Sequence, residues 1–396
     1  MSEPLPIGEA LARVLDRVRV LSTEEVPLGA ADGRVLVEAA AAAVDLPPFP
    51  SSAMDGFAVR AADTPATLPV VARVAAGAPA PRPLGAGEAV AISTGGVVPD
   101  GADAVVPVEL VETRGGEVAV PVVPAGDNVR PRGSDVSAGA EVVAAGLRLG
   151  PAQLGALAAA GVTVVRCARR PRVAVLATGS EMRPPGESLG PGEIYDSNTL
   201  MLASQVRSAG GDVERLPHVT DDERATRRAL ERGLGVDVLV TSGGVSVGEH
   251  DLVRGLLTEL GVEQVFWGVA VRPGRPIAFG VRGATLVFGL PGNPVSSLVG
   301  FELFVRPALL ALQGVAEPRP PFRPGRLAAG VRRNPARESL LRARSRVAGD
   351  AVEVEPLAGQ ESHMIARAAA ADALVLVPRG EGELAAGSDV LYLALG

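Results

Sequence analysis

The segment from Val236 to Asp251 combines residue types that could bind an anion and a cation side by side. A β-branched run, Val238–Val240, is typical of a buried parallel strand and stops at Thr241. Glycines in the following loop let backbone N–H groups approach an anion, and the acidic exit at Glu249 and Asp251 could hold a hydrated cation. Open α/β sheets place ligands at such strand ends. Taken alone, the segment is better explained as a strand-to-helix turn without a ligand.

Two further loops follow strand-like runs in the same part of the chain. Thr178–Glu181 ends one run, and Leu290–Ser296 leads from another directly into a helical pattern. In the second loop, N–H groups at the helix start would face an anion, although its proline is also typical of a simple helix start. Several such loops in one domain favour a ligand that carries phosphate. Asp196 could bind a ligand ring or cap the next helix, and capping is favoured locally.

Two arginines flank a rigid turn in the segment Val271–Pro276, which reads VRPGRP. Guanidinium groups at Arg272 and Arg275 suit bidentate binding of a small oxyanion or phosphate. A surface turn with solvated arginines explains the segment equally well.

The N-terminal part offers weaker candidates. Asp55, in the loop Pro47–Arg60, is either an Asp-Gly turn residue or a carboxylate that positions a metal. The turn-like segments Ile92–Gly96 and Gly101–Ala104 follow, and Arg132–Asp135 adds another acid. None of these segments identifies a site by itself.

The elements around these loops predict a multidomain α/β protein. After Pro171, strand-like and helical runs alternate, which indicates a central doubly wound α/β domain with a largely parallel sheet. Expected helices are Ile7–Val20, one from Pro151 to Gly161, Asn198–Gly210, Asp222–Gly233 with Asp221 as N-cap, and Val295–Leu312. The predicted N-terminal region is helical (1–168) and contains an inserted β-rich subdomain (about 47–140). The α/β domain follows (169–316), and a Pro-rich linker (Glu317–Gly325) leads from it into a C-terminal small β-barrel or sandwich (322–396).

Composition narrows the classes of partner and chemistry. The net charge of −7 argues against non-specific nucleic-acid binding, while the absence of lysine leaves arginine, which suits oxyanions, as the source of positive charge. A single cysteine, Cys167, excludes an intramolecular disulfide and a thiolate metal cage, and three scattered histidines disfavour a histidine zinc site. No signal-peptide core and no membrane-spanning run are recognisable. We therefore expect a cytoplasmic protein without nucleic-acid or membrane partners.

Eight motifs occur in order along the chain: SSAMDGFA, STGG followed by PDGADAVVPVE, GDNVRPRGSD, ATGSE, GEIYDSN, TSGGVSVGEHD, VRPGRPIAFG and GLPGNPVSS. Together they resemble the molybdopterin molybdenumtransferase family, which includes the MoeA proteins and the gephyrin E domain, over essentially the whole chain. The resemblance implies an elongated homodimer that uses adenylylated molybdopterin, molybdate and Mg²⁺. In the implied reaction, molybdenum enters the dithiolene, the phosphoanhydride is hydrolysed and AMP is released.

The resemblance also implies roles for individual positions. The implied catalytic residues are Asp55, Thr94, Asp135, Glu181, Asp221 (with Asp222 as a competing choice) and Asp251, of which Glu181 and Asp251 are also implied metal ligands. The implied substrate-binding residues are Asp196, Ser242, Gly243, Gly244, Ser246, Pro291, Gly292, Asn293 and Ser296. The implied molybdate-binding residues are Arg272, Arg275, Pro276, Arg337, Arg342 and Ser362.

The chain departs from the family pattern in three motifs. Arg272 and Arg275 replace the lysines of the usual KPGKP turn, so a bidentate fork replaces a point charge. Ser180 stands where the usual TGDEL has an acid. In the first motif, Pro50 and Ser51 replace an acid and an amide.

The mechanistic hypothesis combines positioning with electrostatics. Arginines and backbone N–H groups would hold molybdate near the dithiolene sulfurs, while a carboxylate-held cation polarises the pyrophosphate. Two other functions stay open at this point: a molybdopterin adenylyltransferase that acts one step earlier, and a non-enzymatic scaffold like gephyrin. The sequence does not discriminate tungstate from molybdate. The expected protein partners are the upstream adenylyltransferase and downstream factors that mature molybdoenzymes.

Overall fold

The computed structural model describes residues 3–219, 222–244 and 252–395. The chain divides into two compact units: a core unit made of Met1–Glu24 and Cys167–Gly396, and an inserted unit, Glu25–Arg166. Of the site residues predicted above, Asp221, Ser246 and Asp251 lie outside the described residues.

The core unit is built around a six-stranded sheet in the order β16-β13-β17-β21-β20-β18. The strands are β16 (Asp212–Arg215), β13 (Arg172–Ala177), β17 (Val238–Ser242), β21 (Thr285–Leu290), β20 (Ala278–Arg282) and β18 (Glu263–Trp267). The first four are parallel and the last two pair antiparallel. Only β20 runs opposite to the other strands, so the sheet is largely parallel, as predicted. Arg282 of β20 pairs with Thr285 of β21 across a two-residue turn, which is too short for a parallel crossover.

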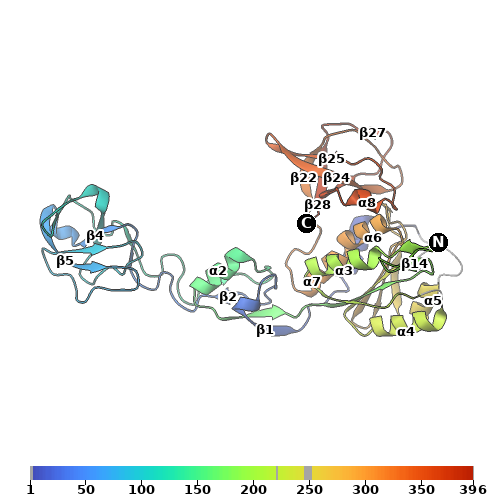
Figure 1. Ribbon diagram of the computed structural model, residues 1–396, viewed down its shortest axis with the longest axis horizontal. Helices are drawn as coiled ribbons and strands as arrows, with labels where there is room; N and C mark the ends of the chain where they lie inside the picture. Colours follow the sequence, from blue (N-terminus) through green and yellow to red (C-terminus); the bar gives the residue numbers. More distant parts are fainter. Residues whose placement is uncertain (1–2, 220–221, 245–251, 396) are drawn as a thin grey trace. The chain divides into compact units, whose positions relative to one another are not determined.

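Helices cover both faces of this sheet, which confirms the doubly wound prediction (Figure 1). Side chains of successive strand residues point to opposite faces, so Val173 and Val175 enter one apolar cluster while Ala174 and Leu176 enter another. The first cluster includes α1 (Ile7–Leu15) and α3 (Asn198–Ser208). The second includes α4 (Glu223–Gly233) and α5 (Leu252–Glu259).

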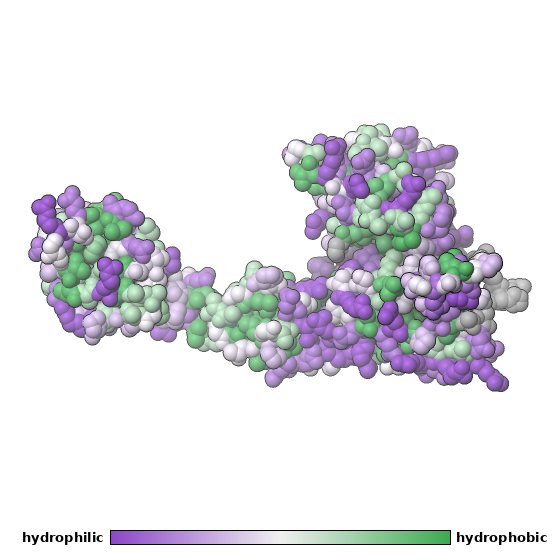
Figure 2. Space-filling model, in the orientation of Figure 1, coloured by the Kyte–Doolittle hydropathy of each residue, from purple (hydrophilic) through white to green (hydrophobic). Residues whose placement is uncertain are grey.

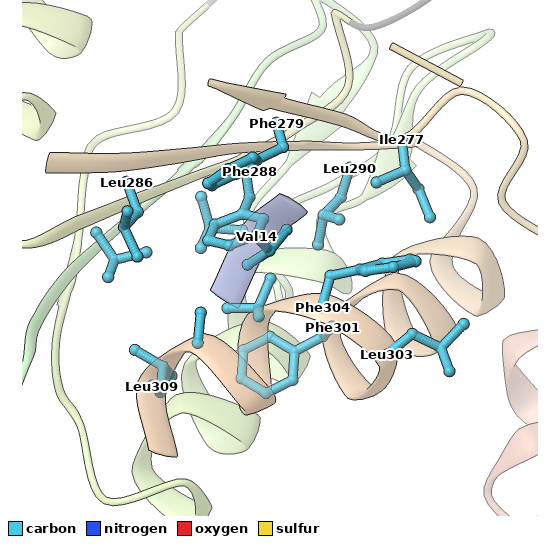
Figure 3. Close-up of a cluster of buried hydrophobic side chains, with 14 of the residues drawn as sticks. Val14, Ile277, Phe279, Leu286, Phe288, Leu290, Phe301, Leu303, Phe304 and Leu309 are labelled. Carbon is cyan, nitrogen blue, oxygen red and sulfur yellow. The ribbon is translucent and has the colours of Figure 1, made fainter. Parts of the chain in front are cut away.

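One continuous helix forms the centre of the first cluster. It consists of α6 (Pro294–Gly300), the π-helical turn η4 (Phe301–Val305) and α7 (Arg306–Leu312). Figure 3 shows Phe301 and Phe304 of this helix in the same buried cluster as Phe288 and Val14. Among the described residues, this helix alone is long and apolar enough to cross a membrane, but 78% of it is buried inside the protein. Its burial is that of a core helix.

A closed five-stranded barrel follows the α/β domain. Its strands pair in the cycle β24-β25-β22-β28-β26 and back to β24, which confirms a barrel over the alternative of a sandwich. The strands are β22 (Arg323–Leu327), β24 (Glu338–Ala348), β25 (Ala351–Pro356), β26 (Ala373–Val377) and β28 (Asp389–Ala394), with β23 (Val331–Arg332), β27 (Glu383–Leu384) and α8 (Ile365–Ala368) in the connections. The predicted linker is shorter than expected, because Arg323–Gly325 already pair with β28.

The inserted unit contains a second six-stranded sheet, in the order β7-β4-β6-β5-β9-β8. These strands are β4 (Gly56–Val59), β5 (Ala66–Val74), β6 (Ala89–Ile92), β7 (Ala104–Pro107), β8 (Glu112–Arg114) and β9 (Glu117–Val120). The rest of the unit holds β2 (Ala40–Ala41), β3 (Ser51–Ser52), β10 (Val129–Arg130), β11 (Glu141–Val143), α2 (Pro151–Ala159) and the short turns η1 (Leu28–Ala30), η2 (Ala61–Asp63) and η3 (Val108–Leu110). Two strands, β1 (Thr23–Pro27) and β12 (Val164–Ala168), cross the boundaries of the unit. The predicted β-rich texture of this region is confirmed.

Two predicted helix ends were wrong. The first helix stops at Leu15 rather than Val20, because the next N–H groups bond three residues back, from Arg17 to Val14 and from Val18 to Leu15. The N-cap of α4 is Asp222 rather than Asp221: its carboxylate accepts the N–H of Ala225 at 2.6 Å.

The surface over α4 and α5 is mostly hydrophilic (Figure 2).

Candidate functional site

A cavity of about 900 Å³ lies at the carboxyl ends of β13, β17 and β21. Three strand-end loops line it together with the segment before α3 and a loop of the barrel. This is the edge at which open α/β sheets bind ligands. Predicted site residues in the lining are Glu181, Asp196, Ser242, Gly243, Gly244, Pro276, Pro291, Gly292 and Asn293. The structure therefore brings together loops that are distant in sequence.

Two glycines of the β17 loop are required by close packing. Gly243 has φ +91°, and a Cβ there would stand 2.6 Å from the carbonyl oxygen of Thr178. Gly244 has φ +64°, and its Cβ would meet Val253 at 2.5 Å. Both positions combine a left-handed backbone with no room for a side chain. Ser246 and Asp251, which follow in this loop, lie outside the described residues.

The loop after β13 places one carboxylate at the cavity. Glu181 lines the cavity and its side chain folds over Gly179, where a Cβ would lie 2.5 Å from Oε2. A ring nitrogen of His218 contacts the carbonyl oxygen of Gly179 from the other side. Asp196 also lines the cavity, but its Oδ1 accepts the N–H of Thr199 at 3.0 Å, which confirms the expected capping of the next helix.

The loop after β21 differs from the predicted anion site at a helix start. Pro294 occupies the first helical position, and the N–H of Val295 donates to the carbonyl oxygen of Ser362 at 3.1 Å. A barrel carbonyl therefore occupies one of the first-turn donors that an anion would use. Ser296 is only 3% exposed and is not among the lining residues. The main-chain oxygen of Ser362, rather than its hydroxyl, makes this contact.

The arginine turn separates the first cavity from a second one of about 890 Å³. Pro276 lines the first cavity, while Arg275 lines the second together with Arg337. The short strand β19 (Val271–Arg272) pairs with the start of β24, so Arg272 and Arg337 are brought close by strand pairing. Burial and the nearby charges of Arg272 and Arg275 lower the pKa of Arg337. Guanidinium groups gathered in this way suit an oxyanion, and Glu3, Glu9 and Glu338 line the same cavity.

Arg342 differs from these arginines, because its guanidinium donates hydrogen bonds to main-chain carbonyl oxygens. It is 1% exposed and donates to the carbonyl oxygens of Met364 at 2.6 Å, Gly359 at 2.7 Å and Glu361 at 3.2 Å. Gln360 adds contacts to its main chain and side chain. These hydrogen bonds hold the loop that carries Ser362. The guanidinium of Arg342 is therefore used to stabilise this loop, which differs from the role of oxyanion ligand implied above.

Two predicted catalytic residues of the inserted unit are in contact. Oδ1 of Asp55 accepts the N–H of Thr94 at 2.7 Å, which fixes the orientation of the carboxylate. Asp135 lies in a different loop, where its N–H donates to the carbonyl oxygen of Leu46. That loop is organised by Asp45, whose pKa is lowered by hydrogen bonds from Ala138 and Arg132.

Residues that sequence reasoning missed also contribute to the two cavities. Asn198 and His363 line the first cavity, and Arg379 lines the second. Asn198 bonds Ser242 and Gly292, which are 44 and 94 residues away along the chain. The motif YDSN contains Asn198, but nothing local indicates these partners. Within the described residues, no group of three or more histidine, cysteine or acidic side chains is placed to hold a metal.

Three regions of known families match the chain in order. Residues 5–161 match the MoeA N-terminal region (domain I and II), residues 174–311 match a probable molybdopterin binding domain, and residues 324–395 match the MoeA C-terminal region (domain IV).

Similar full-length proteins and structures agree with these matches. Molybdopterin molybdenumtransferase 2 of Mycobacterium tuberculosis is 38% identical, over 95% of this chain and 96% of its own length. Molybdopterin molybdenumtransferase of a Nostoc species is 34% identical, over 94% of this chain and 89% of its own length. The crystal structure of the molybdopterin biosynthesis MoeA protein of Pyrococcus horikoshii superposes with a TM-score of 0.81 and 34% identity, over 99% of each chain. The chain therefore belongs to the molybdopterin molybdenumtransferase family.

Proposed function

We propose that the protein is a transferase that inserts molybdenum from molybdate into adenylylated molybdopterin and releases AMP, giving the molybdenum cofactor. The observation that carries this proposal is the pair of cavities on either side of the arginine turn. One is lined by glycine-rich strand-end loops, and the other contains Arg275, Arg337 and Arg379 together with Glu3, Glu9 and Glu338. A phosphate-bearing organic substrate and a tetrahedral dianion would therefore lie next to each other. The relatives that span the whole chain carry the name of this activity.

The first cavity is proposed to hold adenylylated molybdopterin. Its volume of about 900 Å³ is in the range of pockets that enclose a ligand of this size. Backbone groups of the two glycine-rich loops would face the phosphates. The proposed contacts in the described chain are Asp196, Gly243, Gly244, Pro291, Gly292 and Asn293, with Ser246 proposed on sequence grounds.

The second cavity is proposed to hold molybdate. Arg275 and Arg337 line it, with Arg272 near Arg337, and none of the three has an ion pair to a described carboxylate. Burial first, and then the charges of Arg272 and Arg275, lower the pKa of Arg337. A dianion would relieve this repulsion and accept bidentate hydrogen bonds. Arg379 lines the same cavity and would add a further positive charge.

The proposed catalytic groups are carboxylates. In the core unit Glu181 lines the first cavity. In the inserted unit the proposed groups are Asp55, with its orientation fixed by Thr94, and Asp135. Asp221 and Asp251 are proposed from the motif resemblance. We further propose that the attack on the phosphoanhydride occurs while arginines hold molybdate near the sulfurs, so that proximity supplies much of the acceleration.

Mg²⁺ is proposed as the divalent cation. The donor set fits a cation that arrives with the substrate, because Mg²⁺ is usually held by one or two carboxylates, waters and substrate phosphates. In the described chain, Glu181 is placed to contribute a carboxylate, and Asp251 is the second proposed ligand. When bound, the cation would neutralise negative charge on the pyrophosphate.

We also propose that the protein acts as a homodimer in the cytoplasm. The upstream adenylyltransferase and factors that mature molybdoenzymes are the proposed protein partners. These proposals rest on the family and on the bacterial biosynthetic proteins to which the chain is similar. An adenylyltransferase is disfavoured as the function, because matches to the MoeA N-terminal and C-terminal regions flank the probable molybdopterin binding domain.

The proposal is tested by giving the purified protein adenylylated molybdopterin, Mg²⁺ and molybdate, and measuring AMP release together with the metallated cofactor. We expect both products, and we expect both to be lost in Asp55→Ala. Arg332→Ala, in β23 of the barrel, is the matched control and should retain activity. Wild-type protein that forms neither product would overturn the proposal. Replacing molybdate by tungstate in the same assay measures the metal preference.

A further inference from the structure

A buried side-chain network lies in the wall of the first cavity, which Asn198 and Ser242 both line. Asn198, the first residue of α3, is 5% exposed. Its Nδ2 donates to Oγ of Ser242 at 2.8 Å and to the carbonyl oxygen of Gly292 at 2.7 Å. One amide group therefore joins the start of α3 to the ends of β17 and β21.

The network continues into the helix after β21. Oγ of Ser242, which is 2% exposed, lies 3.3 Å from Oγ of Ser297, which is fully buried. The hydroxyl of Ser297 donates to the carbonyl oxygen of Pro291. Two successive carbonyls of the β21–α6 loop, those of Pro291 and Gly292, are thus held by side chains. Holding these two carbonyls also fixes the orientation of the peptide groups to which they belong. Residues of the same loop, Pro291 to Asn293, line the cavity.

The two loops begin at paired strand ends, where Ser242 of β17 lies opposite Leu290 of β21. Gly292 has no side chain, and the one atom within 4 Å of a Cβ built on it is Cα of Gly243, at 3.7 Å. The N–H of Gly243 donates to the carbonyl oxygen of Leu290 at 3.1 Å. Glycine meets glycine at this point. Oγ of Ser242 connects the two loops through the carbonyl oxygen of Pro291 at 3.4 Å and through Oγ of Ser297, and the Asn198 amide joins both loops to the start of α3.

The orientation of the Asn198 amide follows from its partners. Gly292 offers a carbonyl oxygen, which only accepts, so the amide must present its NH₂ group. A carboxylate in the same place would set a negative oxygen against that carbonyl. Oδ1 of Asn198 is buried and has no hydrogen-bond partner among the described residues. The partners of Asn198 therefore require the NH₂ donor of the amide, and a side chain of the same shape without this donor would not replace it.

We propose that Asn198 is a positioning residue that holds the β17 and β21 loops in the arrangement that binds the phosphate-bearing substrate. The inference rests on the proposed function of the first cavity. It adds a residue whose part is to set the geometry of the phosphate-facing backbone, without contact to molybdate. Loss of its donors should weaken binding in the first cavity and leave the arginine turn unchanged.

The test compares two ligands and three variants in the full-length protein. Asn198→Ala removes both donors, and Asn198→Asp keeps the shape but removes them at neutral pH. Gln205→Ala is the matched control, because Gln205 lies two turns further along α3 and its amide bonds Glu302 and Leu298, away from the cavity. Calorimetry measures binding of AMP with Mg²⁺ and, separately, of molybdate. Thermal unfolding is recorded for every variant.

For Asn198→Ala and Asn198→Asp we expect the Kd for AMP to rise by roughly 10- to 100-fold, while the Kd for molybdate stays within about twofold. Binding of AMP to Asn198→Asp should recover at low pH, where the protonated carboxyl group can donate to Gly292 again. Gln205→Ala should lower the unfolding temperature and leave the Kd for AMP unchanged.

A purely structural role would give a different result. If the Asn198 variants only unfold at lower temperature and bind AMP like wild type below that temperature, the inference is wrong. An equal loss of AMP and molybdate binding, reflecting general disruption of the core unit, would overturn it too. Wild-type protein that binds neither ligand would instead count against the proposed function.

Discussion

Replacing Arg342 by methionine should destabilise the barrel loop that carries Ser362, with little direct effect on oxyanion binding. The guanidinium of Arg342 satisfies the carbonyls of Gly359, Glu361 and Met364 from a position that is 1% exposed. A buried acceptor left without a donor costs about 1–3 kcal/mol. The flexible methionine side chain refills part of the volume, and water can reach part of the loop. We therefore expect a loss of about 3–5 kcal/mol in the free energy of unfolding of the barrel.

Hydrogen exchange measured by mass spectrometry provides the assay, because it reports the barrel separately from the other domains. Amides of residues 357–365 and of β24 should exchange faster in Arg342→Met. Arg337→Met is the matched comparison: its positive charge is opposed by Arg272 and Arg275, so its removal should leave exchange unchanged or slower while molybdate binding is lost. Normal exchange in Arg342→Met together with complete loss of molybdate binding would refute this reasoning and restore Arg342 as a direct ligand.

Two further predictions concern backbone space and acid stability. Gly243→Ala should lower the unfolding temperature and abolish AMP binding, because its Cβ would meet the carbonyl oxygen of Thr178 at 2.6 Å. Gly255→Ala, in the open middle of α5, should instead stabilise the protein by about 0.5–1 kcal/mol. Thermal unfolding distinguishes the two variants, and equal effects on the unfolding temperature would contradict the packing argument. Burial raises the pKa of Asp237, but hydrogen bonds from Arg169 and from the main chain outweigh burial and lower this pKa below the usual 3.8. The ionised carboxylate therefore stabilises the folded protein above pH 3.8. This contribution to stability is lost as the pH falls through the pKa of the folded state. Asp237→Asn should therefore lower stability at neutral pH and reduce the loss on acidification, and an unchanged acid limb in denaturation curves would count against the prediction.

Elements governed by single residues could be predicted from the sequence. Pro151 begins α2 and Gly161, with φ +78°, follows its end, as expected from proline and glycine chemistry. Asp196 caps the helix that follows it. The edge of the main sheet was less predictable, since the antiparallel pairing of β20 depends on one short turn within an otherwise strand-like pattern.

The candidate site was predictable as a set of loops but not in the parts played by its side chains. Arg337 and Arg342 are the same residue type five positions apart, and an odd spacing along an extended chain places side chains on opposite faces. One enters the oxyanion cavity and the other is buried against carbonyls. Asn198 could not be recognised because both of its partners are distant in sequence. Such roles arise from tertiary contacts, which local patterns do not encode.

The inserted unit is a domain insertion in the topological sense. The chain leaves the core unit after Glu24 and returns at Cys167, and just inside these points the N–H of Arg169 donates to the carbonyl oxygen of Ser22 at 2.9 Å. The closing contact means that the intervening residues act as one long loop whose ends already meet. Helix α1, with Val14 in the main core, belongs to the part that precedes this loop (Figure 3). A fragment cut at the start of β13 would therefore lack a piece of its own core, whereas a deletion of residues 25–166 bridged by a short turn would keep that core continuous.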